Sequence, residues 1–140
     1  MYGVVLEVFN CELFYNYLND NKGKQFQYGT WDCFVFVEGY YKLRTGKNYF
    51  SDIKGRYKTI KGYLGQIKKL GYSSVYELME ANFCSTALSL VKRGDIVIYN
   101  DCLGLCDGAY SIFLNQDTNF DYSFVETNIC KSAYIVDRGQ

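Results

Sequence analysis

The sequence FQYGTWDCFVFV, residues 26–37, joins a run of turn-forming residues to a run of apolar ones. The apolar run suits a buried strand as well as a helix that is buried on most of its sides. Thr30 as N-cap, with Asp32 in the first turn, favours the helix, because both side chains suit the unpaired N–H groups of a helix start. We predict that this helix ends at Thr45-Gly46, where glycine can take the left-handed C-cap conformation.

Cys33 lies in the first turn of this predicted helix. Unpaired N–H groups and the helix dipole stabilise a thiolate there, and nucleophilic cysteines often occupy such positions. The adjacent Asp32 acts in the opposite direction, because a carboxylate raises the pKa of a neighbouring thiol. From spacing alone, a small buried packing residue is the favoured interpretation of Cys33.

Three further segments of the first part of the chain have helical spacing. Residues 5–19 place Leu6, Phe9, Leu13 and Tyr17 on one stripe. Residues 59–70 form a second stripe, and Ser74 to Glu77 is a capping-box pattern that begins a short helix through about Glu80.

After Arg93-Gly94-Asp95 the pattern becomes typical of β-strands. The predicted strands are Ile96–Tyr99, Leu103–Cys106, Ala109–Leu114, Ser123–Val125 and Ala133–Val136. A helical half (about 1–92) followed by a strand-rich half (about 93–140) predicts an α+β fold in which helices pack on an antiparallel sheet. At this length we expect a single domain, residues 1–140.

The composition excludes several kinds of site. The chain has 140 residues, a formal net charge of zero and no histidine. Cys-His and Ser-His dyads and imidazole metal ligands are therefore excluded. The six cysteines are expected to be free thiols, and since only Cys102 and Cys106 are close in sequence, we expect no zinc or other cofactor. No apolar run is long enough for a membrane span, and the start lacks a signal-peptide pattern.

Charge is unevenly distributed along the chain. The segment from Lys42 to Lys69 contains nine basic residues and one acidic residue, Asp52. The segment from Asp95 to Asp137 contains seven acidic residues and one basic residue, Lys131. Two solvated faces are the simplest interpretation, and head-to-tail assembly of identical copies is a second. A third is salt-sensitive nucleic-acid binding, in which Phe50, Tyr57 and Tyr63 would stack on bases near a group of basic residues. Those basic residues are Lys54, Arg56, Lys58 and Lys61. With no net positive charge and no recognised binding motif, nucleic acid is the least favoured partner.

Several short motifs resemble one family when taken in order. Residues 26–37 are similar to the Tyr/Trp-Gly-x-x-Asp-Cys segment of NlpC/P60-like, papain-related proteins, and more closely to the small phage-encoded subfamily DUF6950. The further matching segments are Thr45-Gly46, Lys54-Gly55-Arg56-Tyr57, Leu70-Gly71-Tyr72, Arg93-Gly94-Asp95-Ile96-Val97, Leu103 to Gly108, and Ala133-Tyr134-Ile135-Val136. The resemblance covers nearly the whole chain from about residue 24.

The resemblance implies a papain-like α+β core in which Cys33 stands at the family's nucleophile position. A histidine at the start of the second strand is the base in active relatives, and here Cys102 takes its place. An unperturbed thiol is a poor base at neutral pH and cannot form the imidazolium of a thiolate–imidazolium pair. The resemblance also implies that Cys33 and Cys102 are close enough for a disulfide under oxidising conditions.

Two functional hypotheses follow from this resemblance. The first is a catalytically silent phage virion protein of the tail or of the tail tip and hub, made in the host cytoplasm. It would assemble with other phage structural proteins or with copies of itself in a ring. The alternative is an active cysteine peptidase or amidase that cleaves bacterial peptidoglycan with Cys33 as nucleophile.

Overall fold

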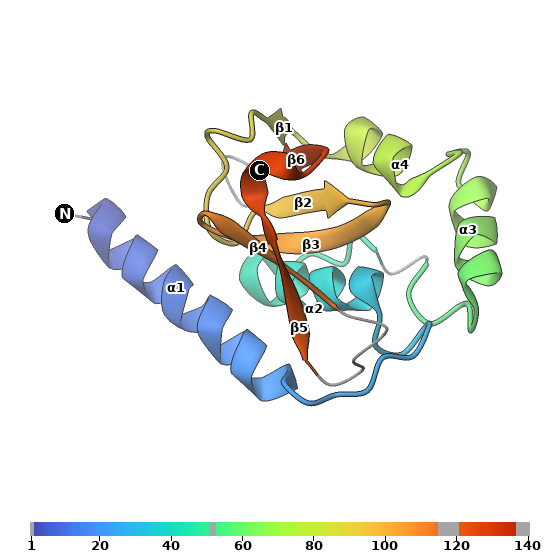
Figure 1. Cartoon of the computed structure of the whole chain (residues 1–140), viewed down its shortest axis with the longest axis horizontal. Helices are drawn as coiled ribbons and strands as arrows, with labels where there is room; N and C mark the ends of the chain where they lie inside the picture. The colour runs from blue at the N-terminus through green and yellow to red at the C-terminus, as the bar shows by residue number, and fades with distance from the viewer. Residues whose placement is uncertain (1, 51–52, 115–120, 137–140) are drawn as a thin grey trace.

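The computed structural model describes residues 2–50, 53–114 and 121–136, and the side chains of the first helix from residue 11 onward. Over these ranges the chain is α+β, with four α-helices and one six-stranded antiparallel sheet (Figure 1). The helices are α1 (Tyr2–Asn21), α2 (Cys33–Thr45), α3 (Ile60–Lys69) and α4 (Val75–Asn82). The strands are β1 (Ser85–Thr86), β2 (Ile96–Tyr99), β3 (Cys102–Asp107), β4 (Tyr110–Leu114), β5 (Tyr122–Glu126) and β6 (Ser132–Tyr134), with a 3-10 turn, Thr127–Ile129, before β6.

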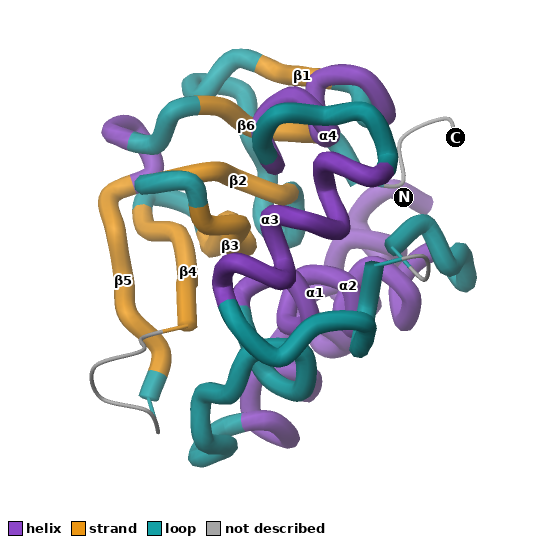
Figure 2. The backbone as a smooth tube through the Cα atoms, turned by 90° about the vertical axis from the view of Figure 1, so that its right-hand side faces the viewer, coloured by secondary structure: helices purple, strands orange, loops and turns teal. Residues whose placement is uncertain are grey.

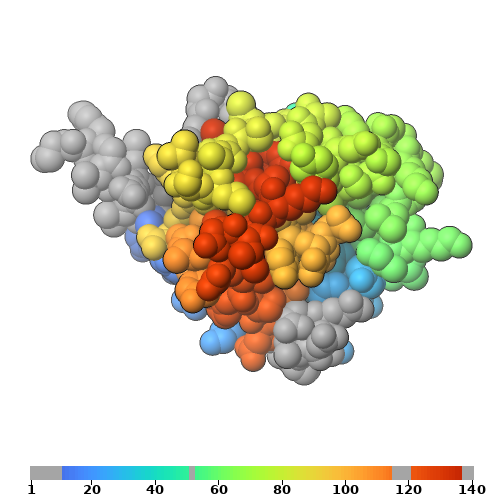
Figure 3. Space-filling view, turned by 45° about the horizontal axis from the view of Figure 1, so that its top comes forward, coloured from blue at the N-terminus to red at the C-terminus, as the bar shows by residue number. Residues whose placement is uncertain are grey.

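The sheet has the strand order β1-β6-β2-β3-β4-β5, and Figure 2 shows it beside the helices. Strands β2 to β5 follow one another as antiparallel neighbours, whereas β6 returns to lie between β1 and β2. The short β1 and the longer β5 are therefore the two edges. Figure 3 shows the segment that carries β1 (yellow) against the C-terminal segment (red) on one face of the molecule.

The main core lies between the helices and one face of the sheet. Tyr40 and Phe36 of α2 are almost fully buried there, together with Ile96 and Leu105 of the central strands. A smaller cluster on the opposite face contains Val97, Cys106, Phe113, Cys130 and Ala133. This division follows from the alternation of side chains along each strand.

The predicted helices and the strands from Ile96 onward are confirmed, with differences at their ends. The predicted helix 5–19 runs from Tyr2 to Asn21, and the last predicted strand, Ala133–Val136, is observed as Ser132–Tyr134. In α1, Tyr17 is buried and Leu13 is half-buried, while the side chains of Leu6 and Phe9 lie outside the described residues. The strand Ser85–Thr86 was not predicted, because two residues carry no periodicity.

The N-cap of α2 is Asp32, and the prediction that Thr30 caps this helix is wrong. The Asp32 side chain accepts a hydrogen bond from the Val35 N–H, whereas Thr30 is exposed in the preceding turn. The predicted C-cap is confirmed, since Gly46 has φ 74° and its N–H donates to the Lys42 carbonyl.

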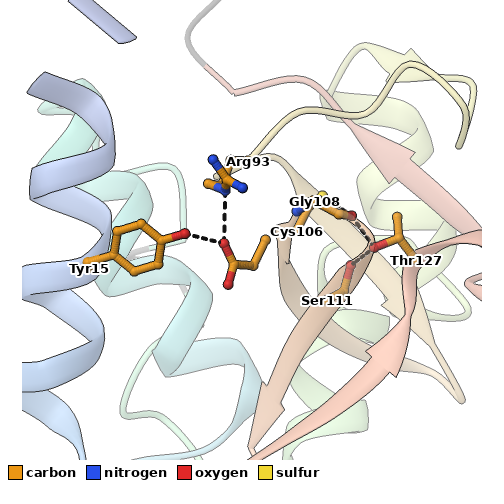
Figure 4. Close-up of polar contacts among 7 residues, drawn as sticks. Tyr15, Arg93, Cys106, Gly108, Ser111 and Thr127 are labelled. Atoms are coloured by element: carbon orange, nitrogen blue, oxygen red, sulfur yellow. Dashed lines mark hydrogen bonds and ion pairs between the residues drawn. The ribbon is translucent and has the colours of Figure 1, made fainter. Parts of the chain in front are cut away.

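Two groups of polar contacts join segments that are far apart in the sequence. The buried Asp95 carboxylate accepts from the N–H groups of Lys92 and Val136, which holds the start of β2 against the end of the chain. On the surface, Tyr15 of α1 and Arg93 both donate to the Asp107 carboxylate, at 2.6 and 2.9 Å (Figure 4). The Arg93–Asp107–Tyr15 contact therefore links α1 to the sheet.

A buried pair of hydroxyls joins β4 to the turn before β6. The hydroxyls of Ser111 and Thr127 are 2.8 Å apart, and the Thr127 hydroxyl donates to the Gly108 carbonyl at 2.7 Å (Figure 4).

We expect Thr127→Val, which keeps the shape and removes the hydroxyl, to lower the free energy of unfolding by about 1–3 kcal/mol. Chemical denaturation measures this loss. Tyr110→Phe, which removes a hydroxyl from a half-exposed side chain of the same strand, serves as the control and should change stability by less than about 0.5 kcal/mol. Equal losses would contradict this interpretation.

Candidate functional site

Cys33 is the first residue of α2 and lines a cavity of about 110 Å³ between that helix, α3 and the β2–β3 turn. The wall of this cavity, which we call the Cys33 cavity, is largely apolar. Its apolar and aromatic residues are Phe26, Tyr28, Phe34, Ile60, Tyr63, Leu103 and Leu114. The polar and thiol groups are Asp32, Cys33, Asp101 and Cys102. Such a cavity has room for a few waters or one small group.

Asp32 holds the segment before Cys33 in place. Its carboxylate accepts from the Gly29 N–H at 2.8 Å, the Val35 N–H at 2.9 Å and the Tyr57 hydroxyl at 2.6 Å. The side chain is only 3% exposed, so these donors satisfy a buried charge. Because the carboxylate already caps the helix start, the helix N-terminus contributes less to stabilising a Cys33 thiolate than an uncapped one would.

Gly29 allows the chain to turn tightly before Asp32. It has φ +85°, and a Cβ at this position would lie 1.9 Å from the Tyr57 carbonyl oxygen. A side chain would therefore face both an unfavourable backbone conformation and a collision with the main chain. The glycine and the aspartate of the Tyr-Gly-x-x-Asp-Cys motif thus have structural roles that depend on Tyr57.

Cys102 reaches the same cavity from the other half of the chain. It is the first residue of β3 and pairs with Tyr99 across a two-residue turn. Asn100 and Asp101 in this turn have φ 50° and 61°, the geometry of a tight hairpin that asparagine and aspartate tolerate. The hairpin brings Cys102 to Cys33, whereas Cys102 and Cys106, the close pair in the sequence, are separated along β3.

The thiols of Cys33 and Cys102 interact, and the interaction changes the pKa of each. The interaction with Cys102, burial and the nearby Asp32 raise the pKa of Cys33 well above its usual range. The same interaction lowers the pKa of Cys102 to about 7, against the opposing effects of desolvation, Asp101 and Asp32. Cys102 is the more exposed of the two thiols, and the Cys33 thiol donates to the Leu114 carbonyl at 4.0 Å. Cys102 therefore carries the first negative charge of the pair.

Among the described residues of the Cys33 cavity, no carboxylate or phenol is arranged as a general base for Cys33. The Asp32 carboxylate is occupied by three donors, and Asp101 acts by raising the pKa of Cys102. Burial raises the pKa of Tyr63, so its hydroxyl stays protonated at neutral pH. The arrangement can therefore perform thiol chemistry, but Cys102 alternates between a thiolate and a neutral thiol and cannot supply the cationic acid of a thiolate–imidazolium pair.

The aromatic rings that the nucleic-acid alternative requires are not exposed. Phe50, Tyr57 and Tyr63 are buried in the core. Lys54 forms an ion pair with the buried Glu38 at 2.9 Å and thus has a structural partner. These three rings therefore cannot stack on bases, because they support α2 and the Cys33 cavity.

Tyr57 is the residue of the site whose role the sequence did not indicate. Its hydroxyl donates to Asp32, and burial together with this hydrogen bond raises the pKa of the phenol well above its usual range. The only signal was its place in the Lys54-Gly55-Arg56-Tyr57 motif, which gives no indication of a partner 25 residues earlier.

None of the described helices is both long and apolar enough to cross a lipid bilayer.

Comparison with known protein families identifies the family of this chain. No curated protein matches the chain. A family model described as a domain of unknown function (DUF6950) matches residues 11–136, which include α2, all six strands and the Cys33 cavity. The chain therefore belongs to the DUF6950 family.

Proposed function

We propose that this protein has an NlpC/P60-like, papain-related fold without hydrolytic activity, and that it is a structural component of a phage particle in the tail or in the tail tip and hub. The observation that carries the loss of activity is that Cys33 and Cys102 line the same cavity, where their interaction raises the pKa of Cys33. The resemblance assigns this second position to the catalytic histidine. A thiol there cannot become the cationic acid that a leaving amine needs.

An exposed aromatic edge supports the assembly role. The register of β4 and β5 pairs Tyr110 with Glu126 and Ile112 with Phe124, so Tyr110 and Phe124 lie on one face. Phe124 is 62% exposed and Tyr110 52% exposed, beside an edge strand with unpaired backbone groups. Aromatic residues at an open edge are suited to contact with another protein chain.

The assembly role is tested on purified particles of the phage that encodes the chain. We expect its peptides in the particle at a constant ratio to other tail proteins. Phe124→Asp should reduce incorporation about tenfold, the effect of losing roughly 1.4 kcal/mol of contact energy. Leu43→Asp alters a comparably exposed side chain on α2 and should incorporate normally. Absence of the protein from particles would overturn the proposal.

Hydrolysis of peptidoglycan is the alternative function, and the accessibility of Cys33 from the Cys33 cavity is what favours it. The test incubates purified protein with bacterial cell-wall material and measures released soluble fragments. We expect no release above background and no difference between the natural chain and Cys33→Ala. Release that disappears in Cys33→Ala would establish the hydrolase and reject the loss of activity.

A further inference from the structure

We infer that Cys33 and Cys102 form a dithiol that reacts with small-molecule disulfides, in which Cys102 attacks first and Cys33 resolves the mixed disulfide. The two thiols line the same cavity, and each changes the pKa of the other. A structural role in a particle does not require this reaction, so its presence or absence is independent of the function proposed above.

The positions of both thiols are held by regular structure. Cys33 begins α2, whose start is capped by Asp32, and Cys102 begins β3 directly after a tight hairpin turn. Helix α2 also packs against β3. The two thiols therefore share one cavity because two packed elements begin there, which favours ring closure over reaction with a second molecule.

The two cysteines differ in exposure in the way that sequential attack requires. Cys102 is exposed, whereas Cys33 is half-buried and its thiol donates to the Leu114 carbonyl. The lowered pKa of Cys102, about 7, supplies thiolate at neutral pH. The other close pair, Cys106 and Cys130, is buried in the smaller core cluster, and burial raises the pKa of both thiols. A disulfide in solution therefore cannot reach Cys106 or Cys130, and neither thiol is ionised at neutral pH.

The reaction consists of two exchanges. The Cys102 thiolate attacks one sulfur of a disulfide RSSR, the S–S bond breaks, and RS⁻ leaves and takes a proton from water. Cys33 then loses its proton to solvent and attacks the Cys102 sulfur, expelling the second RS⁻. The protein loses two protons and two electrons, which reduce one RSSR to two RSH. The product is a Cys33–Cys102 disulfide.

The experiment treats the reduced full-length chain with oxidised glutathione at pH 7, stops exchange with acid and maps the cysteines by mass spectrometry without reduction. We expect the Cys33 and Cys102 peptides to be cross-linked. Cys33→Ser should stop the reaction after the first exchange, so that the mixed disulfide of Cys102 with glutathione accumulates. Cys102→Ser should leave Cys33 largely unmodified. Cys84→Ser removes another exposed thiol, outside the Cys33 cavity, and should react like the natural chain.

Two results would overturn the inference: free Cys33 and Cys102 after treatment, or a Cys33→Ser variant in which glutathione prefers Cys84 to Cys102. A measurement on the natural chain avoids dependence on the folding of variants. A bridge between α2 and β3 should raise the thermal unfolding midpoint by about 5–10 °C, because it closes a long loop in the unfolded chain. An unchanged midpoint after oxidation would contradict a bridge within this packed interface.

Discussion

Replacing Asp32 with alanine is expected to lower the free energy of unfolding by about 3–5 kcal/mol. The substitution removes the N-cap of α2, which is worth about 1 kcal/mol. It also leaves the Gly29 N–H and the Tyr57 hydroxyl without their acceptor, at about 1–3 kcal/mol for each buried group. Urea or guanidinium denaturation followed by circular dichroism measures the loss.

Thr30→Ala is the matched control for Asp32→Ala. Thr30 is two residues earlier, is exposed and does not cap the helix, so its loss should change stability by no more than about 0.5 kcal/mol. If Thr30→Ala were as destabilising as Asp32→Ala, the capping role assigned to Asp32 would be wrong. Tyr57→Phe should fall between the two, because it removes one of the three donors to the carboxylate.

Gly29→Ala is expected to destabilise the protein by about 3 kcal/mol or more. A positive φ costs an alanine about 1–2 kcal/mol, and the displacement of packed backbone adds a comparable amount. The displacement is unavoidable, because the new Cβ would lie 1.9 Å from the Tyr57 carbonyl oxygen. The same denaturation measurement applies, with the yield of soluble protein as a second readout.

Gly46→Ala separates the two contributions at Gly29. Gly46 has φ +74°, and a Cβ there would meet no atom within 4 Å. It should therefore cost only the conformational part, about 1–2 kcal/mol. Equal losses at the two glycines would show that the close approach of Tyr57 to Gly29 does not contribute, and the structural explanation of the motif would fail.

Local patterns predicted most of the secondary structure, because period and caps are properties of neighbouring residues. Thr59 and Ser74 are the N-caps of α3 and α4, each at the start of a predicted helix. At the start of α2 the sequence offers two short polar residues, Thr30 and Asp32, that could each be the N-cap. The choice of Asp32 depends on Tyr57, which lies far along the chain and supplies a third donor. No local pattern contains that partner.

The Cys33 cavity was predictable only in part for the same reason. Cys33 at a helix start follows from local signals, whereas the position of Cys102, just before the strand predicted from Leu103, was assigned by the resemblance. Their approach to each other depends on the packing of α2 against β3. The burial of Phe50, Tyr57 and Tyr63 likewise depends on tertiary packing, since an aromatic ring in a basic segment has the same local pattern whether exposed or buried. Strand β1 exists because β6 returns to pair with it.

The central claim is that Cys102 stands beside Cys33 as the ionised partner, in place of a base that would activate Cys33. It makes a specific prediction about pH. Cys102 should be about half ionised near pH 7, so its alkylation should slow as the pH falls through 7 and level off above it. Cys33 should stay protonated and slow through this range, because its pKa is raised well above the usual value.

The most direct test is alkylation of the native reduced protein with iodoacetamide between about pH 5 and 9, with the rate at each cysteine resolved by peptide mass spectrometry. We expect Cys102 to react with a midpoint near pH 7, and faster than Cys33 at neutral pH. Cys33→Ala removes the interaction that lowers the pKa of Cys102 and should move the Cys102 midpoint upward. If Cys33 were instead the fastest-reacting thiol at neutral pH, it would be an activated nucleophile, and the claim that its chemistry has been lost would be contradicted.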